Sequence, residues 1–464
     1  MVANRQVKDA AMQAFISGLS GQALQPGDDG YEAARRVNNA MVDRKPRVIV
    51  RCSGVADITR CITFAREHQI TLSVRGGGHS ASGLAICDDG LVVDLGGFKG
   101  VDVNPASRVA RVDGGCTWAD MDLATHAFGL ATPGGVISTT GVGGLTLGGG
   151  FGHLTRRYGL SCDNVISADM ILADGKAVTA SATENQDLFW AIRGGGGNFG
   201  IVTSFQFKLH PVKTVYAGPV FYPLGQTSAA LQFFGDFMKT APRELSAFFA
   251  FLIVPPWPEY PVDLHLQRLC GVVLCYCGDM TKAEEVTRPL REFGPPVYSH
   301  TIFRPYPAVQ TLADPLLPPG LYHYNKADII NGINDEMIRV HLQYGPAVPT
   351  IQSAMHIYPL NGAVHDVGHD ETAFAYRSSE FTHLITAVDP DPGPMPGYIN
   401  WLRQYWDALH PYSAGGSYVN FMMDEGSDRV ASGYPGNLEK LGKIKKKYDP
   451  DNFFHMNQNI APAA

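Results

Sequence analysis

A run of glycines beside a histidine is the stretch of this sequence best suited to chemistry. Residues 75–80 read Arg-Gly-Gly-Gly-His-Ser and follow residues 72–74, whose apolar and polar side chains alternate as in a half-buried strand. Consecutive glycines let the backbone turn sharply and expose its N–H groups at close range. Successive N–H groups form a concave site for an anion. The pattern predicts a diphosphate-binding loop, with His79 facing the molecule that carries the diphosphate.

Two further glycine loops, at residues 141–152 and 194–200, strengthen this interpretation. A single triple glycine also fits a plain surface turn, and His79 alone also fits a hydrogen-bonded loop histidine. Three such loops in one chain favour a long phosphate-bearing ligand that is held by backbone groups.

The third loop contains the spacing Gly195-x-Gly197-x-x-Gly200, which has the letters of a dinucleotide-binding fingerprint. That fingerprint requires a strand, a loop and then a helix, so that the pyrophosphate meets a helix N-terminus. Here a predicted helix precedes the loop and a predicted strand follows it. The sequence therefore argues against a nicotinamide-dinucleotide site at this position.

Composition narrows the class of protein. The chain has 464 residues, enough for two or three domains, and its net charge of −7 argues against nucleic acid as a partner. No apolar run reaches ~18 residues, and residues 1–14 lack the pattern of a signal peptide. We therefore expect no membrane span and a cytoplasmic location. The basic run at residues 443–447 fits the solvated end of a helix.

The eight cysteines show neither a Cys-x-x-Cys pair nor, together with the histidines, the spacing of a zinc site. Cys275 and Cys277 are two apart in an apolar run, so they are expected on one face of a strand. We expect no metal site and mostly reduced cysteines in the core.

Predicted helices and strands alternate around the glycine loops. Apolar residues at helical spacing predict a helix over residues 53–70, and Thr117 with Asp120 forms a capping box that opens a second helix. Another capping box at residues 183–186 predicts a third. Residues 132–152 are expected to form neither a packed helix nor a strand, because each interior glycine costs about 1 kcal/mol. Strands are expected at residues 47–51, 71–75, 90–95, 108–112, 165–173, 176–180 and 201–209.

After residue 211 the predicted strands and loops become longer. Strands are expected at residues 218–223, 248–254, 270–277, 352–359 and 380–388, and helices at 227–240, 281–293 and 397–409. This alternation predicts an antiparallel sheet with helices on one face. We place domains at residues 1–210, 211–410 and 411–464. The last segment carries a predicted helix at 437–448 and the polar run Asn457-Gln-Asn459, which we expect to dock on the first domain.

Five ordered motifs are shared with one known family. They are Arg75-Gly-Gly-Gly-His-Ser80, Gly141-Val-Gly-Gly144 with Gly148-Gly-Gly-Phe-Gly152, Arg157-Tyr-Gly-Leu-Ser-Cys-Asp-Asn164, Asp187-Leu-Phe-Trp-Ala-Ile-Arg-Gly194 and Asn457-Gln-Asn-Ile460. The chain resembles the FAD-linked oxidases of the berberine bridge enzyme-like group, within the vanillyl-alcohol oxidase and p-cresol methylhydroxylase (PCMH) superfamily. The resemblance covers residues 45–210 and 415–460, and it is weak in between.

The resemblance implies an α+β fold: a split PCMH-type FAD-binding domain, interrupted by a substrate domain whose antiparallel sheet is covered by helices. It also implies an extended FAD, with its diphosphate on the loops at 75–80 and 141–152, and a covalent bond from His79 to the flavin 8α-methyl group. The cofactor-binding residues that it implies are Arg75, Gly76, Gly77, Gly78, His79, Ser80, Gly83, Thr139, Thr140, Gly141, Gly144, Gly148, Gly149, Gly152, Gly200, Ile201, Val202, Asn420, Asn457 and Asn459.

The sequence departs from the family pattern at two positions. Many members attach the flavin a second time through a cysteine four residues before Gly-Val-Gly-Gly, and this chain has Ile137 there. A single covalent bond is therefore expected. Plant members carry a tyrosine base at the end of Tyr-x-Asn-Tyr, and this chain reads Tyr-Val-Asn-Phe, ending at Phe421. Phenylalanine cannot accept a proton, so the general base is left unassigned.

The reaction that the resemblance implies is the oxidation of an alcohol or amine. A hydride passes to flavin N5, a base removes the neighbouring O–H or N–H proton, and O2 then takes the electrons and becomes H2O2. The base must lie within hydrogen-bond reach, and a phenol with a pKa of ~10 needs a partner that lowers it. We name Tyr418 and Tyr376 as candidates, with Arg377 as the partner, and His383 and Glu380 after them. Each also fits a purely structural role.

Two other classes of function stay open at this point. One is a dehydrogenase that reduces a quinone-like acceptor and excludes oxygen. The other is a flavin-binding protein without redox turnover, which would fit the loss of the tyrosine at Phe421. All readings involve a small molecule, and neither the substrate nor the oligomeric state follows from the sequence.

Overall fold

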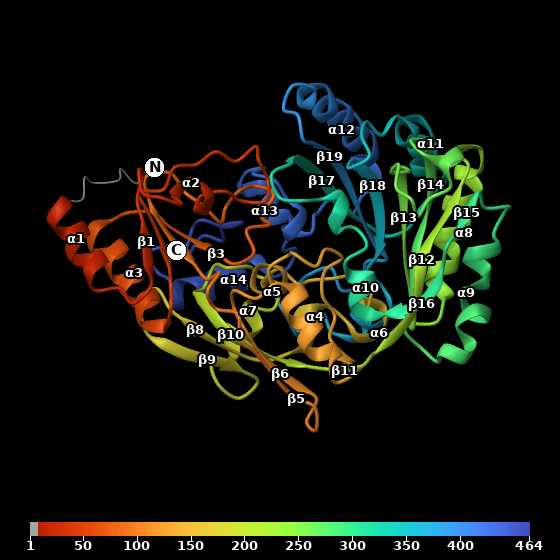
Figure 1. The fold of residues 1–464 in the computed structure, drawn as a ribbon. Helices are drawn as coiled ribbons and strands as arrows, with labels where there is room; N and C mark the ends of the chain where they lie inside the picture. Colours follow the sequence, from red (N-terminus) through yellow and green to blue (C-terminus); the bar gives the residue numbers. More distant parts are fainter. Residues whose placement is uncertain (1–7) are drawn as a thin grey trace.

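The computed structural model describes residues 8–464, which form a molecule of mixed helices and sheets. Figure 1 shows two lobes: the chain starts in one lobe, builds the other in its second half and returns, so that both marked ends lie in the first lobe. Our expectation for the N-terminal segment partly concerns residues 1–7, which lie outside the described residues. Within residues 8–464, no helix has both the length and the hydropathy needed to cross a membrane.

A four-stranded sheet with the order β1-β2-β4-β3 carries the first glycine loop. The strands β2 and β3 both run parallel to β4, and helix α3 (Val55–His68) connects β2 to β3. Because β3 ends at Arg75, the glycines that follow lie at the carboxyl end of that strand. The strands are β1 (Gln22–Leu24), β2 (Val48–Arg51), β3 (Leu72–Arg75) and β4 (Leu91–Asp94), and the short helices α1 (Asp9–Ser17) and α2 (Tyr31–Ala34) precede β2.

A five-stranded antiparallel sheet, ordered β5-β6-β10-β8-β9, completes the first lobe. Its strands are β5 (Val101–Asn104), β6 (Val109–Asp113), β8 (Val165–Ile171), β9 (Ala177–Ser181) and β10 (Ile201–Lys208). The predicted hairpin of β8 and β9 is confirmed. The capping box at α4 (Trp118–His126) is also confirmed, because Thr117 N–H donates to the Asp120 carboxylate at 2.7 Å and Thr117 Oγ1 accepts from Asp120 N–H at 3.4 Å.

Two local predictions in this lobe are wrong. Thr183 caps no helix: its N–H donates to Ser181 Oγ in a turn, and α7 (Gln186–Ala191) begins three residues later. The glycine-rich segment 132–152 contains the short helix α5 (Val142–Leu147). Gly143 of this helix serves packing, since a Cβ there would lie 3.1 Å from the Gly114 carbonyl oxygen.

An eight-stranded antiparallel sheet forms the second lobe, with the main order β15-β12-β14-β13-β18-β19-β17 and β16 beside β12. Four helices cover one face, as predicted, and their apolar sides enclose a core that includes Phe249 and Met355 of the sheet. These elements are β12 (Thr214–Tyr222), β13 (Leu245–Ile253), β14 (Arg268–Tyr276), β15 (Tyr298–Ser299), β16 (Ile302–Pro305), β17 (Tyr322–Ile330), β18 (Ala354–Pro359), β19 (Phe381–Asp389), α8 (Thr227–Thr240), α9 (Ala283–Glu292), α11 (Asp335–Tyr344) and α12 (Met395–Leu409).

The C-terminal segment docks on the first lobe. It contains α13 (Ser427–Ser432) and α14 (Leu438–Tyr448). Asn198 holds the last residues, because its amide donates to the Gln458 carbonyl oxygen at 3.1 Å and accepts from Ile460 N–H at 2.9 Å. The basic run is only partly solvated, because Lys445 is fully buried and bonds Asp449 at 2.7 Å.

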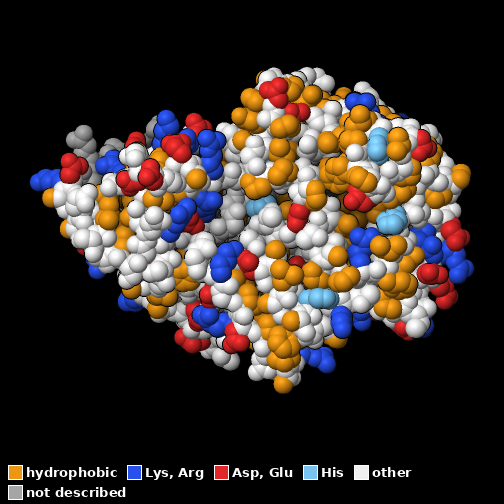
Figure 2. Space-filling view, in the orientation of Figure 1, with side chains coloured by type: hydrophobic (Ala, Val, Ile, Leu, Met, Phe, Trp, Pro, Cys, Tyr) orange, Lys and Arg blue, Asp and Glu red, His pale blue; other side chains and the backbone are white. Residues whose placement is uncertain are grey.

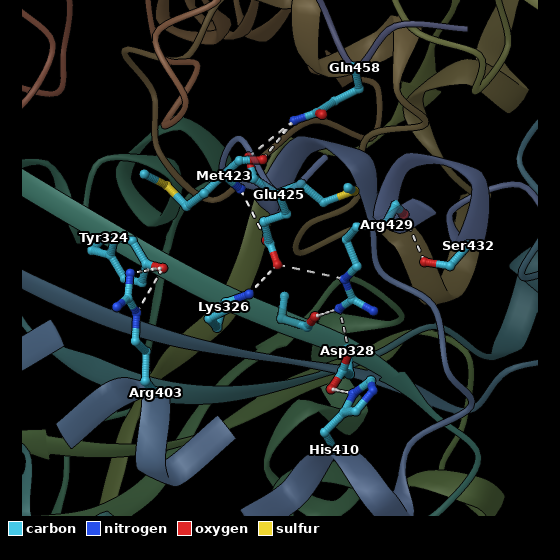
Figure 3. A network of polar contacts seen from close by, with 12 residues as sticks. Tyr324, Lys326, Asp328, Arg403, His410, Met423, Glu425, Arg429, Ser432 and Gln458 are labelled. Atoms are coloured by element: carbon cyan, nitrogen blue, oxygen red, sulfur yellow. Dashed lines mark hydrogen bonds and ion pairs between the residues drawn. The ribbon is translucent and has the colours of Figure 1, made fainter. Parts of the chain in front are cut away.

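A network of charged side chains joins the same segment to the second lobe (Figure 3). Glu425 pairs with Lys326 of β17, and Arg429 of α13 pairs with Asp328 of the same strand. His410 adds a hydrogen bond to Asp328 at 2.9 Å. Lys326, Asp328, Glu425 and Arg429 are largely shielded from water, so salt screens their attraction little. The segment after residue 411 therefore contacts both lobes.

Candidate functional site

A large cavity lies where the two lobes meet, and Figure 2 shows the surface hollowed in this region. Its volume is about 590 Å³, within the range of small-molecule and cofactor sites. One wall consists of the glycine loops and the C-terminal segment, and the other consists of the sheet face that carries no helices. None of the described residues that line it is Asp, Glu, Lys or Arg.

The first two glycine loops touch each other backbone to backbone at this wall. A Cβ on Gly77 would lie 2.3 Å from Gly141 N, and a Cβ on Gly141 would lie 2.4 Å from Gly77 N. Neither distance is compatible with a side chain. The contact explains why the two motifs occur together, and it leaves backbone groups of both loops at the cavity surface.

His79 is held at the end of the first loop by two threonines. Its Nε2 lies 2.9 Å from Thr139 Oγ1, and its Nδ1 lies 3.4 Å from Thr140 Oγ1. Burial lowers the pKa of His79 to about 4, because the charged imidazolium would lose its hydration. The ring is therefore neutral at pH 7, with one nitrogen lone pair available for bonding.

Several residues of the cavity lining fit a large polar ligand. Each has a buried side-chain polar atom without a hydrogen-bond partner in the part of the chain that the structure describes: Asn38 Nδ2, His323 Nε2, Asn325 Oδ1, Tyr434 Oη and Asn457 Oδ1. An unsatisfied buried polar atom costs about 1–3 kcal/mol. Such a cluster is expected where a ligand supplies the missing partners.

The opposite wall is the open face of the eight-stranded sheet. Successive residues of a strand point to opposite faces. On β18, Met355 and Ile357 enter the helix-covered core, whereas Ala354, His356 and Tyr358 line the cavity. The other strands contribute the remaining lining of this wall: Pro219, Phe221, Phe248, Ala250, Leu252, Val273, His323, Asn325, Leu384, Thr386 and Val388.

His356 and Tyr358 were not among the residues singled out from the sequence. The Tyr358 hydroxyl lies 2.9 Å from His356 Nδ1. Burial lowers the pKa of His356 to about 4 and raises the pKa of Tyr358. Their i, i+2 spacing between Met355 and Ile357 is a signal that they share one face, although not that this face borders a cavity.

Of the predicted proton acceptors, Tyr418 alone lines the cavity within the described residues. Its hydroxyl oxygen accepts hydrogen bonds from Gly150 N–H at 2.9 Å and from Asn420 Nδ2 at 2.6 Å. Burial raises its pKa, and these two donors oppose the rise. Phe421 also lines the cavity, with its ring centroid 5.1 Å from that of Tyr418.

The structure keeps the other candidates away from this cavity. The Tyr376 hydroxyl donates to the Ser432 carbonyl oxygen. Arg377 forms a two-bond ion pair with Asp163, at 2.8 and 2.6 Å, so it is not the partner of a tyrosine. His383 is fully buried, and Glu380 accepts from Asn361 at 2.9 Å.

Most of the predicted cofactor-binding residues meet at the cavity. Those that line it are Gly76, Gly77, Gly78, His79, Ser80, Thr140, Gly141, Gly144, Gly200, Ile201, Val202, Asn420 and Asn457. The structure does not bring the remaining seven to its surface: Arg75, Gly83, Thr139, Gly148, Gly149, Gly152 and Asn459. Two of these support residues that do line it, because Thr139 contacts His79 and a Cβ on Gly148 would collide with Asn420.

Comparison with known proteins assigns the family. The family described as FAD binding domain matches residues 46–181, and the family described as berberine and berberine like matches residues 417–461. An FAD-linked oxidoreductase of Dictyostelium discoideum is 34% identical over 457 residues, covering 97% of this chain and 96% of the relative. The chain belongs to the FAD-linked oxidoreductases. The predicted relationship to the berberine bridge enzyme-like group is thereby confirmed.

Other FAD-linked oxidoreductases extend the similarity to the whole fold. The (R)-6-hydroxynicotine oxidase of Paenarthrobacter nicotinovorans is 27% identical and covers 96% of this chain, with 97% of its own length matched. The crystal structure of 6-hydroxy-D-nicotine oxidase from Arthrobacter nicotinovorans superimposes with a TM-score of 0.86 at 24% identity, over 96% of this chain and 99% of that one. A variant of berberine bridge enzyme in complex with (S)-reticuline gives the same TM-score at 20% identity, over 99% and 100%. The predicted α+β fold of the PCMH type is confirmed.

The buried and half-buried histidines of this FAD-linked oxidoreductase predict how its stability depends on pH. Burial lowers the pKa of each to about 3 or 4, whereas an exposed histidine titrates near 6.5: His79, His153, His210, His323, His341, His356 and His383. Between pH 6.5 and 4 the unfolded chain binds protons that the folded chain does not. The neutral histidines therefore contribute fully to the free energy of unfolding above pH 6.5, and this contribution is lost as the pH falls towards 4.

We expect the urea midpoint to fall steadily from pH 7 to pH 5, measured by tryptophan fluorescence. Asp122 has the opposite effect on stability, because burial raises its pKa to about 7 and the folded chain then binds its proton more tightly than the unfolded chain. One such carboxyl is outweighed by the seven histidines. A His341→Gln variant removes one titrating group and should show a shallower pH dependence. A midpoint that is constant or higher at pH 5 would contradict the prediction.

Proposed function

We propose that this protein is an oxidase that removes a hydride from an alcohol or amine carbon of a small molecule. The observation that carries the proposal is the single cavity shared by the glycine loops, His79 and the open sheet face. The names of relatives such as the (R)-6-hydroxynicotine oxidase and the tetrahydroberberine oxidase of Berberis wilsoniae support an oxidase. We also propose O2 as the electron acceptor and residues 211–410 as the substrate domain.

The residues at the cavity suit FAD, which when bound supplies the electron acceptor that amino-acid side chains lack. Backbone N–H groups of residues 76–78 and 141–144 suit its diphosphate, because glycine lets a phosphate approach the chain closely. Asn457 and Tyr434 provide buried polar atoms for further contacts. The neutral ring of His79 is suited to a covalent bond with the flavin.

The side chains of the open sheet face have a separate role in the proposal. They border the cavity opposite the glycine loops, where a substrate would lie between sheet and flavin. The apolar members exclude water and orient the reacting carbon, and the polar members receive the proton of the neighbouring O–H or N–H group. The protein increases the rate by holding the substrate and the flavin in this arrangement.

Anaerobic reduction followed by air exposure tests the proposal. The purified holoprotein is mixed without oxygen with panels of alcohols and of amines, while the visible flavin absorbance is recorded. We expect at least one compound to bleach the flavin, and air to restore the colour with one H2O2 per turnover. Bleaching that air does not reverse, but a quinone does, would indicate a dehydrogenase instead. A flavin that no compound bleaches would contradict redox turnover.

A further inference from the structure

We propose that Tyr358 accepts the substrate proton, that His356 positions it and receives its proton in turn, and that the substrate is a neutral, apolar alcohol. The inference rests on the proposed function, and it names the catalytic tyrosine and the substrate class of the same site. Nothing in the family motifs points to either residue, because both lie in the weakly matching middle of the chain.

The two side chains form a defined pair on β18. The Tyr358 hydroxyl lies 2.9 Å from His356 Nδ1, and the two rings meet edge to face, 5.4 Å apart. Phe151 and Phe248 pack on Tyr358, with ring centroids 5.4 and 5.0 Å away. These contacts fix the direction of the phenol, as a catalytic group requires.

The pair lies beside Phe421, the position at which the family motif would have a tyrosine hydroxyl. The ring centroid of Tyr358 is 6.1 Å from that of Phe421, and both residues line the cavity. A hydroxyl carried by β18 therefore reaches the region that a tyrosine at 421 would serve. We infer that the opposite wall of the cavity supplies the missing group.

Tyr418, the other cavity tyrosine near Phe421, is less suited to this task. Its oxygen already accepts two N–H hydrogen bonds, from Gly150 and Asn420, which occupy its lone pairs. The Tyr358 hydroxyl instead faces His356 Nδ1. In the tautomer that leaves this nitrogen unprotonated, the hydroxyl donates to it and keeps its own lone pairs available for a substrate hydroxyl. Only Tyr358 can accept one proton while passing on another.

In the bound complex a C–H bond and an O–H bond of the alcohol break. The C–H bond of the carbinol breaks, and FAD, when bound against the glycine loops, would accept its hydrogen together with both electrons. The O–H bond breaks as its proton moves to Tyr358, whose own proton moves to His356 Nδ1. The alcohol is oxidised to a carbonyl compound. A weak base suffices, because a hydroxyl becomes strongly acidic once its carbon has lost a hydride.

The cavity lining sets the substrate class. Within the described residues it contains no Asp, Glu, Lys or Arg, so a carboxylate or an ammonium group would lose its hydration without gaining an ionic partner. Aromatic and aliphatic side chains dominate the sheet wall, including Phe221, Phe248, Leu252 and Leu384. His323 Nε2 and Asn325 Oδ1 on this wall lack partners among the described residues, so the wall can bond a few polar atoms of a ligand, fewer than the hydroxyls of a sugar. A neutral, largely apolar alcohol loses least on entry.

The test uses the holoprotein with cinnamyl alcohol, its analogues bearing a carboxylate or a trimethylammonium group, and glucose. Calorimetry on the oxidised protein should show cinnamyl alcohol binding at least about 100-fold more tightly than both charged analogues and glucose. Equal or tighter binding of a charged analogue or of glucose would overturn the substrate class. If amines but no alcohols bleach the flavin, the proposed oxidase stands and this inference fails.

Stopped-flow reduction of the flavin by cinnamyl alcohol tests the pair itself. Tyr358→Phe should slow reduction about 100-fold or more, as expected for loss of a general base, and change the dissociation constant less than about fivefold. The double variant Tyr358→Phe, Phe421→Tyr should reduce its flavin at least about tenfold faster than Tyr358→Phe alone. His356→Gln should also slow reduction of the flavin. This variant provides the test of the pair if Tyr358→Phe does not retain its flavin.

A matched control is available on the other side of the sheet. Tyr405 also bonds a histidine, with its hydroxyl 2.6 Å from His341 Nδ1, but it lies in the helix-covered core. Tyr405→Phe should reduce its flavin at the wild-type rate. Wild-type rates in both Tyr358→Phe and His356→Gln would overturn the assignment while leaving the oxidase intact. If no alcohol or amine reduces the flavin of the wild-type protein, the result would contradict the proposed function and this inference together.

Discussion

Wild-type protein is expected to keep its yellow colour in the pellet after acid precipitation, whereas a His79→Ala variant should release all of its flavin into the supernatant. The imidazole of His79 is neutral at pH 7, because burial lowers its pKa to about 4, and only the neutral ring has a lone pair with which to form a bond. Thr139 holds Nε2 at 2.9 Å and fixes the ring at the cavity. Absorbance of pellet and supernatant measures the outcome.

Proteolysis and mass spectrometry provide the control, and FAD should be found on the peptide that contains His79 and on no cysteine peptide. Cys162 is the tempting alternative, yet burial raises its pKa, so it stays a thiol rather than a reactive thiolate. Ile137, which lines the cavity, has no nucleophile. Cys162→Ser should keep its flavin. A flavin adduct on a Cys162 peptide, or free flavin from the wild type, would contradict a single bond through His79.

Replacing Gly77 by alanine is expected to abolish FAD binding and to lower the free energy of unfolding by about 3 kcal/mol or more, the upper range for overpacking a rigid site. The new Cβ would lie 2.3 Å from Gly141 N and 2.6 Å from its Cα. Both obstacles are backbone atoms, so no side chain can rotate away. FAD content after purification and a urea titration measure the two effects.

Alanine variants of two other glycines distinguish a steric clash within the protein from a clash with the cofactor. A Cβ on Gly144 or on Gly225 meets no atom within 4 Å, but only Gly144 lines the cavity. Gly225→Ala should keep both stability and FAD. Gly144→Ala should keep the stability of the flavin-free protein and lose FAD affinity if the cofactor lies against this loop. A Gly77→Ala protein with normal stability and FAD content would refute the backbone contact.

The sequence predicted local features well because each rests on neighbouring residues. The turn between β8 and β9 follows from Asp174-Gly175, and the start of α4 follows from Thr117 and Asp120. The glycine loops and His79, which line the cavity, were singled out for the same reason. β17 was missed, since its first half carries the half-buried polar residues His323, Asn325 and Lys326 without a clear alternation.

The proposed proton acceptors, Tyr358 and His356, could not be singled out in this way. Which strand face borders the cavity depends on the neighbours of β18, namely β13 and β19, which lie about a hundred residues before it and some twenty after it. No local pattern contains that order. Tyr376 was named from its motif, but its hydroxyl is used by Ser432, a contact across 56 positions. Local chemistry thus points to the residues that we propose for the cofactor, and only the tertiary fold points to those that we propose for the substrate.

The docking of the C-terminal segment also dictates when the protein can mature during synthesis. Asn457 donates to the Gly197 carbonyl oxygen, 260 positions earlier, and Glu425 pairs with Lys326, 99 positions earlier. At ~5–20 residues per second, a ribosome takes on the order of tens of seconds between making the third glycine loop and making the residues that close over it. During that interval the wall that contains the glycine loops lacks its C-terminal part, so a nascent chain stalled before residue 417 would have no complete binding site for its cofactor.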